Sequence, residues 1–269
     1  MESQTQSTTE VFADTLRCQL APGSRIKLIG LGGVGCIVLD YLTLFLRSLE
    51  VPVRLVLIDG DEFEPSNCQR MRFERFGNKA EVKAAEVASL VGGSPIIVLP
   101  VPEYVSPENL SRLIRNGDHV FLCVDNHETR RLVSDHCDTL DSVALFSGGN
   151  DGVEPPHTQG TYGNVQIAIR QNARAVTASL TRFHPEIRNA EGRLPGPDCA
   201  QMGQSTPQIL MANLAVASAM LNAFFAYTCG QLAYQEVQFD ILAARSLPQF
   251  PLPPDLIPQP LPPPPAAKG

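Results

Sequence analysis

Short apolar runs alternate with helical segments through the first 150 residues, and this alternation most constrains the fold. The runs with the length and composition of buried strands are RIKLIG (25–30), VRLVLID (53–59), PIIVLPV (95–101), HVFLCV (119–124) and SVALFSG (142–148). The segments between them are typical of helices, such as the Ala-, Glu- and Lys-rich stretch at 79–91. Strands that alternate with helices form βαβ units, so we predict an α/β fold with a mainly parallel sheet flanked by helices.

The sequence indicates the bounds of two further helices. SPENLSRLI (106–114) is expected to be a helix with Ser106 as its N-cap and Pro107 at its first position. The uncharged stretch at 209–229 has nearly the length of a membrane span. Asn213, Ser218 and Asn222 interrupt it, so we expect a buried core or interface helix and no membrane association.

The pattern changes after residue 150. NVQIAIR (164–170) alternates like an antiparallel strand, 171–206 is expected to be a long irregular segment, and 232–241 reads as a last strand. Ten of the 23 prolines fall between 248 and 265, a composition typical of polyproline II. We therefore predict a flexible N-terminal arm (1–22), one folded domain (23–245) and a Pro-rich disordered tail (246–269).

Charge and cysteine content narrow the class of protein. The net charge of −7 argues against a nucleic-acid partner, which would need a basic face. The chain has 7 cysteines, an odd number, and no CxxC pair, so neither a disulfide framework nor a four-Cys zinc site is expected. The N-terminus has no signal-peptide pattern, and we expect a cytoplasmic protein with free thiols.

A Gly-rich turn, GLGGVG, lies between the first strand and its helix. Glycines at such a turn let the backbone approach a phosphate, and a helix N-terminus favours its negative charge. The strand before it and the helix after it make a nucleotide site the best interpretation, in a Rossmann-like domain. The candidate phosphate-binding residues are Gly30, Gly32, Gly33 and Gly35.

The stretch DGDEFEPSNCQRM begins where the second strand ends, at Asp59. A carboxylate in that position commonly accepts ribose hydroxyls, and an NAD-dependent dehydrogenase would also carry one. A dehydrogenase has no need for Asn67, Arg70 and Lys79 directly afterwards. A triphosphate does need such groups, because its β- and γ-phosphates carry charge that must be held.

A second acidic position follows the fourth strand, in VDNHETRR (124–131). Asp125 is expected at the same carboxyl edge of the sheet as the Gly-rich turn and Asp59, where ligands of such sheets bind. A carboxylate that faces a triphosphate there is a natural Mg²⁺ ligand. Asn126 could simply cap the following helix, and Arg130 could be purely structural.

Together, these motifs resemble the ThiF/MoeB/E1 superfamily, whose members activate ubiquitin-like proteins. The order is Gly-x-Gly-Gly-x-Gly, Asp-x-Asp with Ser-Asn-x-x-Arg, a Lys that opens a helix, and Asp-Asn-x-x-x-Arg. The resemblance covers residues 25–150 well and 195–227 more weakly. It implies an adenylyltransferase: with ATP and Mg²⁺, a partner's C-terminal carboxylate becomes an acyl-adenylate and pyrophosphate leaves.

The resemblance also implies roles for residues and partners. Asp59, with Asp61 beside it in the motif, would bind the nucleotide through its ribose, and Asp125 would hold Mg²⁺. The phosphates would be held by Asn67, Arg70 and Lys79. The acyl partner would be a ubiquitin-like or sulfur-carrier protein that ends in Gly-Gly, and a homodimer is expected. Cys199 lies where some relatives carry a cysteine that takes over the acyl group as a thioester or acyl disulfide.

Departures from the family pattern leave alternatives open. Met71 replaces the Gln that commonly follows the motif Arg, and the short gap after Arg70 leaves Lys83 as a second candidate to Lys79. Cys199 could equally be a small buried residue, as we expect of the cysteines at 36, 123, 137 and 229. Cys68 lies near the phosphate motif and is expected only to fill space. An NAD-dependent oxidoreductase and a non-catalytic E1-like nucleotide-binding scaffold remain the alternative functions.

Overall fold

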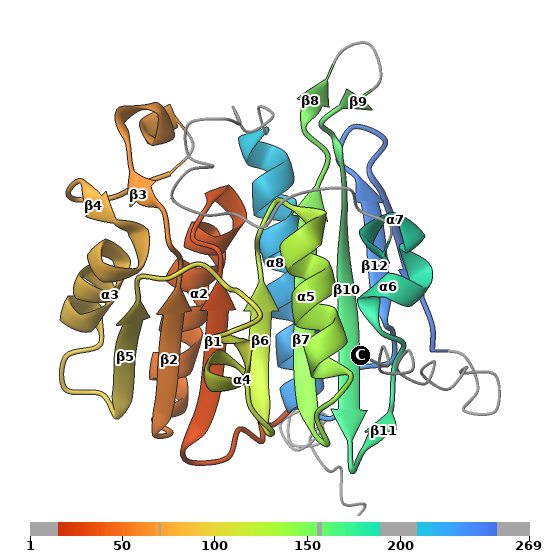
Figure 1. The fold of residues 1–269 in the computed structure, drawn as a ribbon, viewed down its shortest axis with the longest axis horizontal. Coiled ribbons are helices and arrows are strands. Elements are labelled where there is room, and N and C mark those ends of the chain that lie inside the picture. Colours follow the sequence, from red (N-terminus) through yellow and green to blue (C-terminus); the bar gives the residue numbers. More distant parts are fainter. Residues whose placement is uncertain (1–15, 70, 155–157, 189–208, 252–269) are drawn as a thin grey trace, which may run out of the picture.

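The computed structural model describes residues 16–69, 71–154, 158–188 and 209–251. Its centre is one mixed sheet (Figure 1) with the strand order β13-β12-β10-β7-β6-β1-β2-β5. The five parallel strands are β1 (Ser24–Ile29), β2 (Val53–Ile58), β5 (Ile96–Val101), β6 (Asp118–Leu122) and β7 (Val143–Asn150). These confirm the predicted fold class and lie within a residue or two of the predicted runs.

The C-terminal part extends the sheet with antiparallel strands, as predicted. These are β10 (Tyr162–Gln171), β12 (Glu236–Asp240) and β13 (Arg245–Gln249), with β11 (Arg174–Ala175) beside β10. Two short ribbons lie outside the sheet, β3 (Glu62–Phe63) with β4 (Gly77–Asn78) and β8 (Val153–Glu154) with β9 (Thr158–Gln159).

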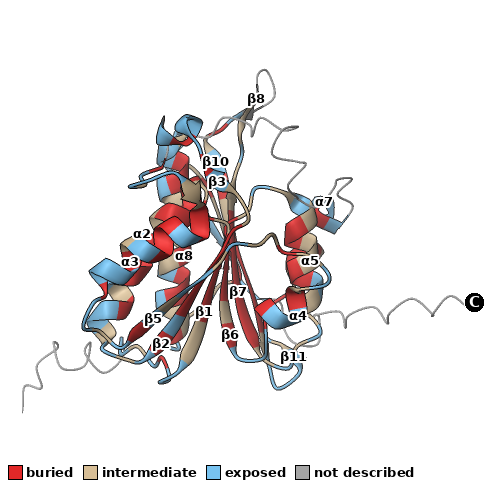
Figure 2. Ribbon diagram, turned by 60° about the vertical axis from the view of Figure 1, so that its left-hand side comes forward, coloured by how far each residue is buried: buried red, intermediate tan, exposed pale blue. Residues whose placement is uncertain are grey.

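Helices cover both faces of the sheet, and Figure 2 shows the two layers edge-on. One face carries α2 (Gly33–Leu49), α3 (Lys79–Leu90) and α8 (Leu210–Thr228). The other carries α4 (Leu110–Leu113), α5 (His127–Cys137), α6 (Leu180–Phe183) and α7 (Pro185–Arg188). Each layer has its own apolar core. In the first, the rings of Phe121, Phe146 and Phe224 pack against one another with centroids 5.1 to 5.6 Å apart.

Helix α8 is the expected apolar helix at the predicted place. Among the described helices it alone is long and apolar enough to cross a membrane by length and composition. In this fold it packs along α2 and against β7 and β10, and Val216, Met220 and Phe224 are completely buried there. It thus completes the first layer of the domain.

Three local expectations are corrected. Helix α4 begins at Leu110 with Asn109 as N-cap, because Ser106 to Asn109 form a turn in which the Asn109 side chain accepts the Ser106 N–H. The predicted irregular segment contains β11, α6 and α7, while 189–208 lie outside the described residues. Residues 246–249 belong to β13 rather than to a tail.

The end of the predicted N-terminal arm is packed against the domain where it is described. The Gln19 N–H donates to Thr228 O at 2.8 Å, the Cys229 thiol donates to Leu16 O at 3.2 Å, and Leu20 is buried. The rest of the arm (1–15) and residues 252–269 of the tail lie outside the described residues.

Topology fixes where a ligand can bind. From β1 the chain moves outward through β2 to β5, and it then returns to place β6 and β7 on the other side of β1. The order therefore reverses between β1 and β6, and sheets of this type bind ligands outside the carboxyl ends of the strands at that point. That edge lies at the top of Figure 1.

Candidate functional site

The Gly-rich turn lies at the reversal point and leads into α2. Gly30 has φ of +88°, and a side chain there would approach the backbone of Cys123 to 3.0 Å. A Cβ on Gly35 would lie 1.9 Å from Gly30 O, so only glycine lets the first turn of α2 pack this closely. These close contacts explain why both positions carry glycine.

Gly32 has a different environment. It is the N-cap of α2, offers no side-chain cap, and a Cβ added there would meet no atom within 4 Å. The first turn of α2 also carries no acidic residue. An uncapped helix N-terminus with open space before it fits an anionic group, which its N–H groups and dipole would attract. The turn therefore fits the phosphates of a nucleotide.

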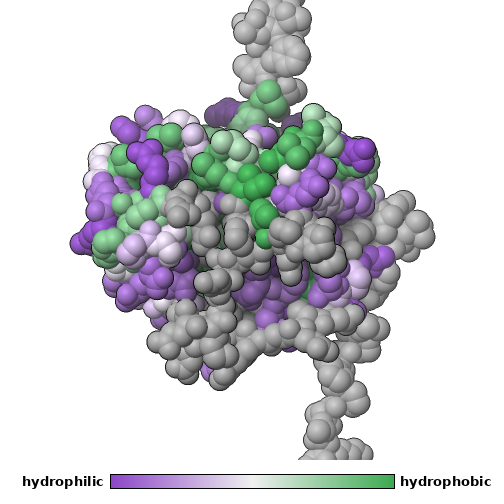
Figure 3. All heavy atoms as spheres, turned by 90° about the horizontal axis from the view of Figure 1, so that it is seen from above, coloured by the Kyte–Doolittle hydropathy of each residue, from purple (hydrophilic) through white to green (hydrophobic). Residues whose placement is uncertain are grey.

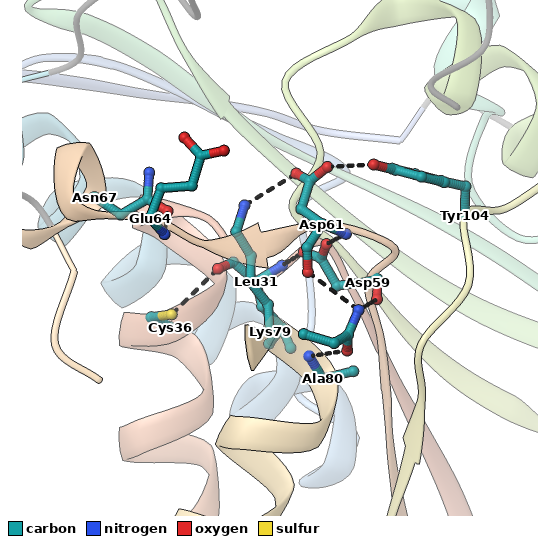
Figure 4. A network of polar contacts seen from close by, with 10 residues as sticks. Leu31, Cys36, Asp59, Asp61, Glu64, Asn67, Lys79, Ala80 and Tyr104 are labelled. Atoms are coloured by element: carbon teal, nitrogen blue, oxygen red, sulfur yellow. Dashed lines mark hydrogen bonds and ion pairs between the residues drawn. The ribbon is translucent and has the colours of Figure 1, made fainter. Parts of the chain in front are cut away.

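Asp59 and Asp61 lie beside this turn at the end of β2 (Figure 4). Asp59 is buried, and its carboxylate accepts the Leu31 N–H at 2.5 Å and the Asp61 N–H at 2.8 Å. The Asp59 carboxylate is thus tied directly to the Gly-rich turn. Asp61 is more open, with 45% of its side chain exposed.

Lys79, the first residue of α3, completes the group. Its ammonium lies 2.9 Å from Asp61 Oδ2, and its backbone N–H donates to Asp61 O at 2.9 Å. Its neighbour Asn78 caps α3 and donates its side-chain N–H groups to Asp59 O and Asp61 O, at 3.0 and 3.1 Å. Residues from β2 and α3 that the sequence placed in one site therefore do come together.

Electrostatics in this group follow from burial and from one cation between two acids. Burial raises the pKa of Asp59, and the Lys79 ammonium offsets this only in part. Burial would also raise the pKa of Asp61, but Lys79 and the Tyr104 hydroxyl outweigh it, so that pKa is lowered. Burial opposes the Lys79 charge, yet the two carboxylates raise its pKa. Lys79 and Asp61 are therefore both charged near neutral pH.

The remaining predicted phosphate ligands differ in their positions. Asn67 is buried in the 3₁₀ helix η1 (Pro65–Gln69), where its side-chain oxygen accepts the Glu64 N–H at 3.1 Å. Lys83, the second lysine candidate, donates to Arg72 O and pairs with Glu86 at 2.7 Å. Lys79 is thus the lysine that lies with the two acids, and Lys83 is occupied elsewhere. Arg70 lies outside the described residues.

Asp125 is exposed in the loop after β6, at the same edge of the sheet. Asn126 caps α5 by accepting the Thr129 N–H at 2.8 Å, which is its structural role. Among the described residues, no three His, Cys, Asp or Glu side chains form a metal cluster. Mg²⁺ needs none, because it commonly binds through one or two carboxylates and the phosphates of its substrate.

Arg130 has the structural role that the sequence left open. Its guanidinium is buried and donates to Val124 O at 2.6 Å, Ser147 Oγ at 2.7 Å and Gly148 O at 2.7 Å. It thereby joins the loop that carries Asp125 to the end of β7. A spacing of five residues after Asp125 was the available signal, but sequence alone could not give the acceptors.

The cysteines separate into buried and open ones. Cys36, Cys123, Cys137 and Cys229 are buried, as predicted, and burial raises the pKa of Cys36 and of Cys123 to about 12. These thiols are therefore poor nucleophiles. Cys68 was expected to fill space, but it is exposed on η1. Cys199 lies outside the described residues.

Tyr104 is the site residue that the sequence analysis missed. Its hydroxyl donates to Asp61 Oδ1 at 2.6 Å, opposite Lys79 (Figure 4). It follows β5 in a loop with no glycine-rich or charged motif, so no sequence signal marked it.

Comparison with known proteins identifies the family of the chain. The model of the ThiF family matches residues 6–255. The adenylyltransferase and sulfurtransferase MOCS3 of Xenopus laevis is 34% identical over 115 residues, which are 42% of this chain and 24% of that protein. The molybdopterin-synthase adenylyltransferase of Haemophilus influenzae is 28% identical over 159 residues, 55% of this chain and 63% of that protein. The matched region thus spans less than two thirds of either relative.

The fold has counterparts among solved structures. The structure of E. coli MccB with ATP superposes with a TM-score of 0.62 at 13% identity, covering 88% of this chain and 66% of that one. At this identity the likeness concerns the fold, and it places the described sheet and helices in the same architecture.

Proposed function

The chain belongs to the ThiF family, whose model covers nearly its whole length, and on that premise we propose that it is an ATP-dependent adenylyltransferase. Its substrate would be the C-terminal carboxylate of a ubiquitin-like or sulfur-carrier protein that ends in Gly-Gly. The carboxylate attacks the α-phosphate, the α–β phosphoanhydride bond breaks, and pyrophosphate leaves. The relatives named above are adenylyltransferases, which supports the class of reaction.

The observation that carries the proposal is the meeting of two features at one edge of the sheet. The uncapped N-terminus of α2 offers N–H groups to phosphates, and the Asp59–Asp61–Lys79 group lies next to it, joined by the Leu31 N–H. An anion cradle beside a ribose-type acid and a cation suits a nucleoside triphosphate. Dinucleotide oxidoreductases share the cradle and the acid, but they give Lys79 no role.

Each side chain has a part in the proposed reaction. Asp59 accepts the ribose hydroxyls, and Asp61 keeps Lys79 beside the phosphates. Asn67, Arg70 and Lys79 hold the phosphate oxygens and screen them from the incoming carboxylate, since two anions must meet. Asp125 would hold Mg²⁺, which would supply further positive charge beside the phosphates.

Cys199 would act after adenylation. Its thiolate would attack the acyl carbon, the bond from that carbon to the AMP oxygen would break, and AMP would leave with the electron pair. A thioester would result. This step rests on the position of Cys199 in the sequence. The buried cysteines, with raised pKa values at Cys36 and Cys123, are poor candidates for it.

A homodimer is part of the proposal, and the outer face of α2 and α8 supports it. Figure 3 shows apolar atoms gathered on the side where these helices lie. The face is formed by Tyr41 and Leu44 on α2 and by Leu210, Met211, Leu214 and Phe225 on α8, which are 37 to 59% exposed. Helix α8 has no charged residue, so its apolar side chains would be better covered by a second copy of the same face than by water.

A cytoplasmic location and the lack of nucleic-acid or membrane partners complete the proposal. The net charge of −7 supports the exclusion of nucleic acid. The packing of α8 against the sheet supports its role as a core helix. Free thiols at the described cysteines agree with a reducing compartment.

The test is thermal unfolding of the purified protein with Mg-ATP, with NAD, and with neither. A ligand that binds only the folded protein raises its Tm. We expect Mg-ATP to raise Tm and Asp125→Ala to reduce that increase. The matched control is Asp141→Ala, an aspartate that is also exposed and lies just before β7, on the opposite edge of the sheet. It should leave the increase unchanged.

Each outcome decides between functions. A Tm raised by NAD alone would replace the adenylyltransferase with an oxidoreductase. A Tm that neither nucleotide changes would favour the non-catalytic scaffold. With binding established, ATP–pyrophosphate exchange that requires a Gly-Gly carrier protein separates an active enzyme from a scaffold that only binds ATP.

A further inference from the structure

Tyr104 lies at the nucleotide edge of the sheet, beside Asp61, although nothing in the sequence motif points to it. It follows β5, whose last residue Val101 accepts the Asp59 N–H at 3.2 Å, so its loop runs directly over the end of β2. Asn109 fixes this loop from the other side, because its side-chain N–H donates to Tyr104 O at 2.9 Å. Tyr104 is therefore attached both to the nucleotide edge and to the start of α4.

The ring of Tyr104 packs against Gly60. A Cβ added to Gly60 would lie 2.5 to 2.8 Å from the ring atoms Cδ2, Cγ and Cδ1. Gly60 is thus the residue between the two acids that lets an aromatic ring lie flat against the backbone. With the ring held there, the hydroxyl reaches Asp61 Oδ1 at 2.6 Å.

Asp61 is the only member of the described acid pair that needs such support. Asp59 is buried and held by two backbone N–H groups, whereas almost half of the Asp61 side chain is exposed. The two Asp61 oxygens are divided between Tyr104 and Lys79 (Figure 4). Because the oxygens of one carboxylate are rigidly linked, a bond that fixes Oδ1 also fixes the direction in which Oδ2 faces.

We propose that Tyr104 is a positioning residue: through Asp61 it aims the Lys79 ammonium at the nucleotide phosphates. The inference rests on the proposed function, since it needs a phosphate for Lys79 to contact. Without the Tyr104 hydroxyl, Asp61 can rotate toward solvent and draw Lys79 with it. Lys79 is a flexible side chain with a point charge, so its placement depends on what holds it.

Tyr104→Phe is the variant that isolates this role, because it keeps the ring on Gly60 and removes only the hydroxyl. We expect Mg-ATP affinity to fall by about fivefold to tenfold, within the range for the net contribution of one typical hydrogen bond. In the nucleotide-free protein, the pKa of Asp61, followed by carboxyl ¹³C NMR, should rise toward its ordinary value. Tyr234→Phe, at a tyrosine between α8 and β12, is the matched control and should change neither quantity.

A double-mutant cycle tests whether Tyr104 acts through Asp61. In an Asp61→Asn background, Tyr104→Phe should weaken Mg-ATP binding no further, because the carboxylate that it positions is absent. If Tyr104→Phe costs the same in both backgrounds, Tyr104 acts independently of Asp61 and the inference is wrong. Loss of folding would not confuse the result, since the far-UV circular dichroism and Tm of every variant without ligand are compared first.

The two proposals fail in different ways. If the wild type binds Mg-ATP and Tyr104→Phe matches it in affinity and in the pKa of Asp61, the inference is overturned and the adenylyltransferase stands. If the wild type does not bind Mg-ATP, the proposed function is overturned and with it the nucleotide role of Tyr104. A raised pKa of Asp61 with unchanged Mg-ATP affinity would also overturn the inference, because Tyr104 would then affect Asp61 without affecting nucleotide binding.

Discussion

At the scale of single residues, we expect substitution by alanine to affect stability very differently at Gly32 and at Gly35. Gly35→Ala should destabilise the fold by about 2 kcal/mol or more, because its Cβ would lie 1.9 Å from Gly30 O and the backbone would have to move. Gly32→Ala should cost far less, because the added Cβ meets no atom within 4 Å. Urea unfolding of the two variants measures the difference, and equal losses would contradict it.

The Gly32 substitution should instead reduce nucleotide binding. Its Cβ would occupy the open space before α2, where the proposed phosphates lie. We expect Mg-ATP affinity of Gly32→Ala to fall by about tenfold or more while its stability stays close to that of the wild type. Isothermal titration calorimetry is the measurement. Unchanged affinity would show that no phosphate approaches the helix N-terminus at this point.

The two lysines of α3 give a second comparison. Lys79→Gln should abolish ATP–pyrophosphate exchange, because it removes the cation between Asp59 and Asp61. Lys83→Gln should mainly lower stability, because the Lys83 ammonium is buried and holds Arg72 O and Glu86. Exchange rates at equal folded fraction separate these effects. A Lys83 variant that folds normally but has no activity would give the phosphate role to Lys83 instead.

At this scale, the sequence could predict a site residue only where its position is set by its neighbours in the chain. Gly30 and Asp59 were predictable, because a strand end followed by a glycine or an acid fixes their place locally. Tyr104 was not, because its partner Asp61 lies 43 residues earlier and meets it only when β5 pairs with β2. Arg130 was found as a position, but its oxygen acceptors belong to two other strand ends.

At the scale of elements, the parallel strands and α5 were predictable because apolar runs and Asn126 mark their ends. Strand β13 was hidden by composition: Pro248 suggested a tail, yet proline fits an edge strand, where its missing N–H is not needed by the sheet. Helix α4 was predicted too early because Ser106 resembles an N-cap. The structure uses Asn109, three residues later, since Ser106 opens the preceding turn.

One element contact carries a prediction about pH. His184, at the end of α6, lies between Glu236 of β12 at 2.8 Å and Glu186 of α7 at 2.6 Å, with Asn164 of β10 beside it. The hydrogen bond to the buried Glu236 raises the pKa of His184, and His184 in turn lowers the pKa of Glu236 against its burial. The charged pair therefore ties α6 and α7 to the antiparallel strands.

The sign of the effect follows from these directions. The His184 contribution is fully present below its ordinary pKa of about 6.5 and is lost as pH rises through the raised value. The Glu236 contribution is present above about 4.5 and is lost as pH falls through its lowered value. We expect His184→Gln to reduce the free energy of unfolding by about 1 kcal/mol near pH 6 and by less near pH 9.

Urea unfolding across this pH range is the measurement, and Glu236→Gln supplies the control. In a Glu236→Gln background, His184→Gln should have a much smaller effect at pH 6, because the carboxylate that favours the charged imidazole is gone. His127 also faces this group, but burial lowers its pKa, so we assign the loss of stability above pH 6 to His184. A loss that grows with pH would contradict the assignment.

At the scale of the whole molecule, the proposed homodimer should depend on the outer face of α2 and α8. Leu44→Glu and Met211→Glu would each place a charge in that face, twice over if the interface is symmetric, so either should shift the dimer to monomer. Light scattering after gel filtration measures the mass. Leu242→Glu, at a leucine 74% exposed in the turn between β12 and β13, is the control and should leave the dimer intact. A wild type that stays monomeric at high concentration would contradict the prediction and leave the apolar face to a different partner.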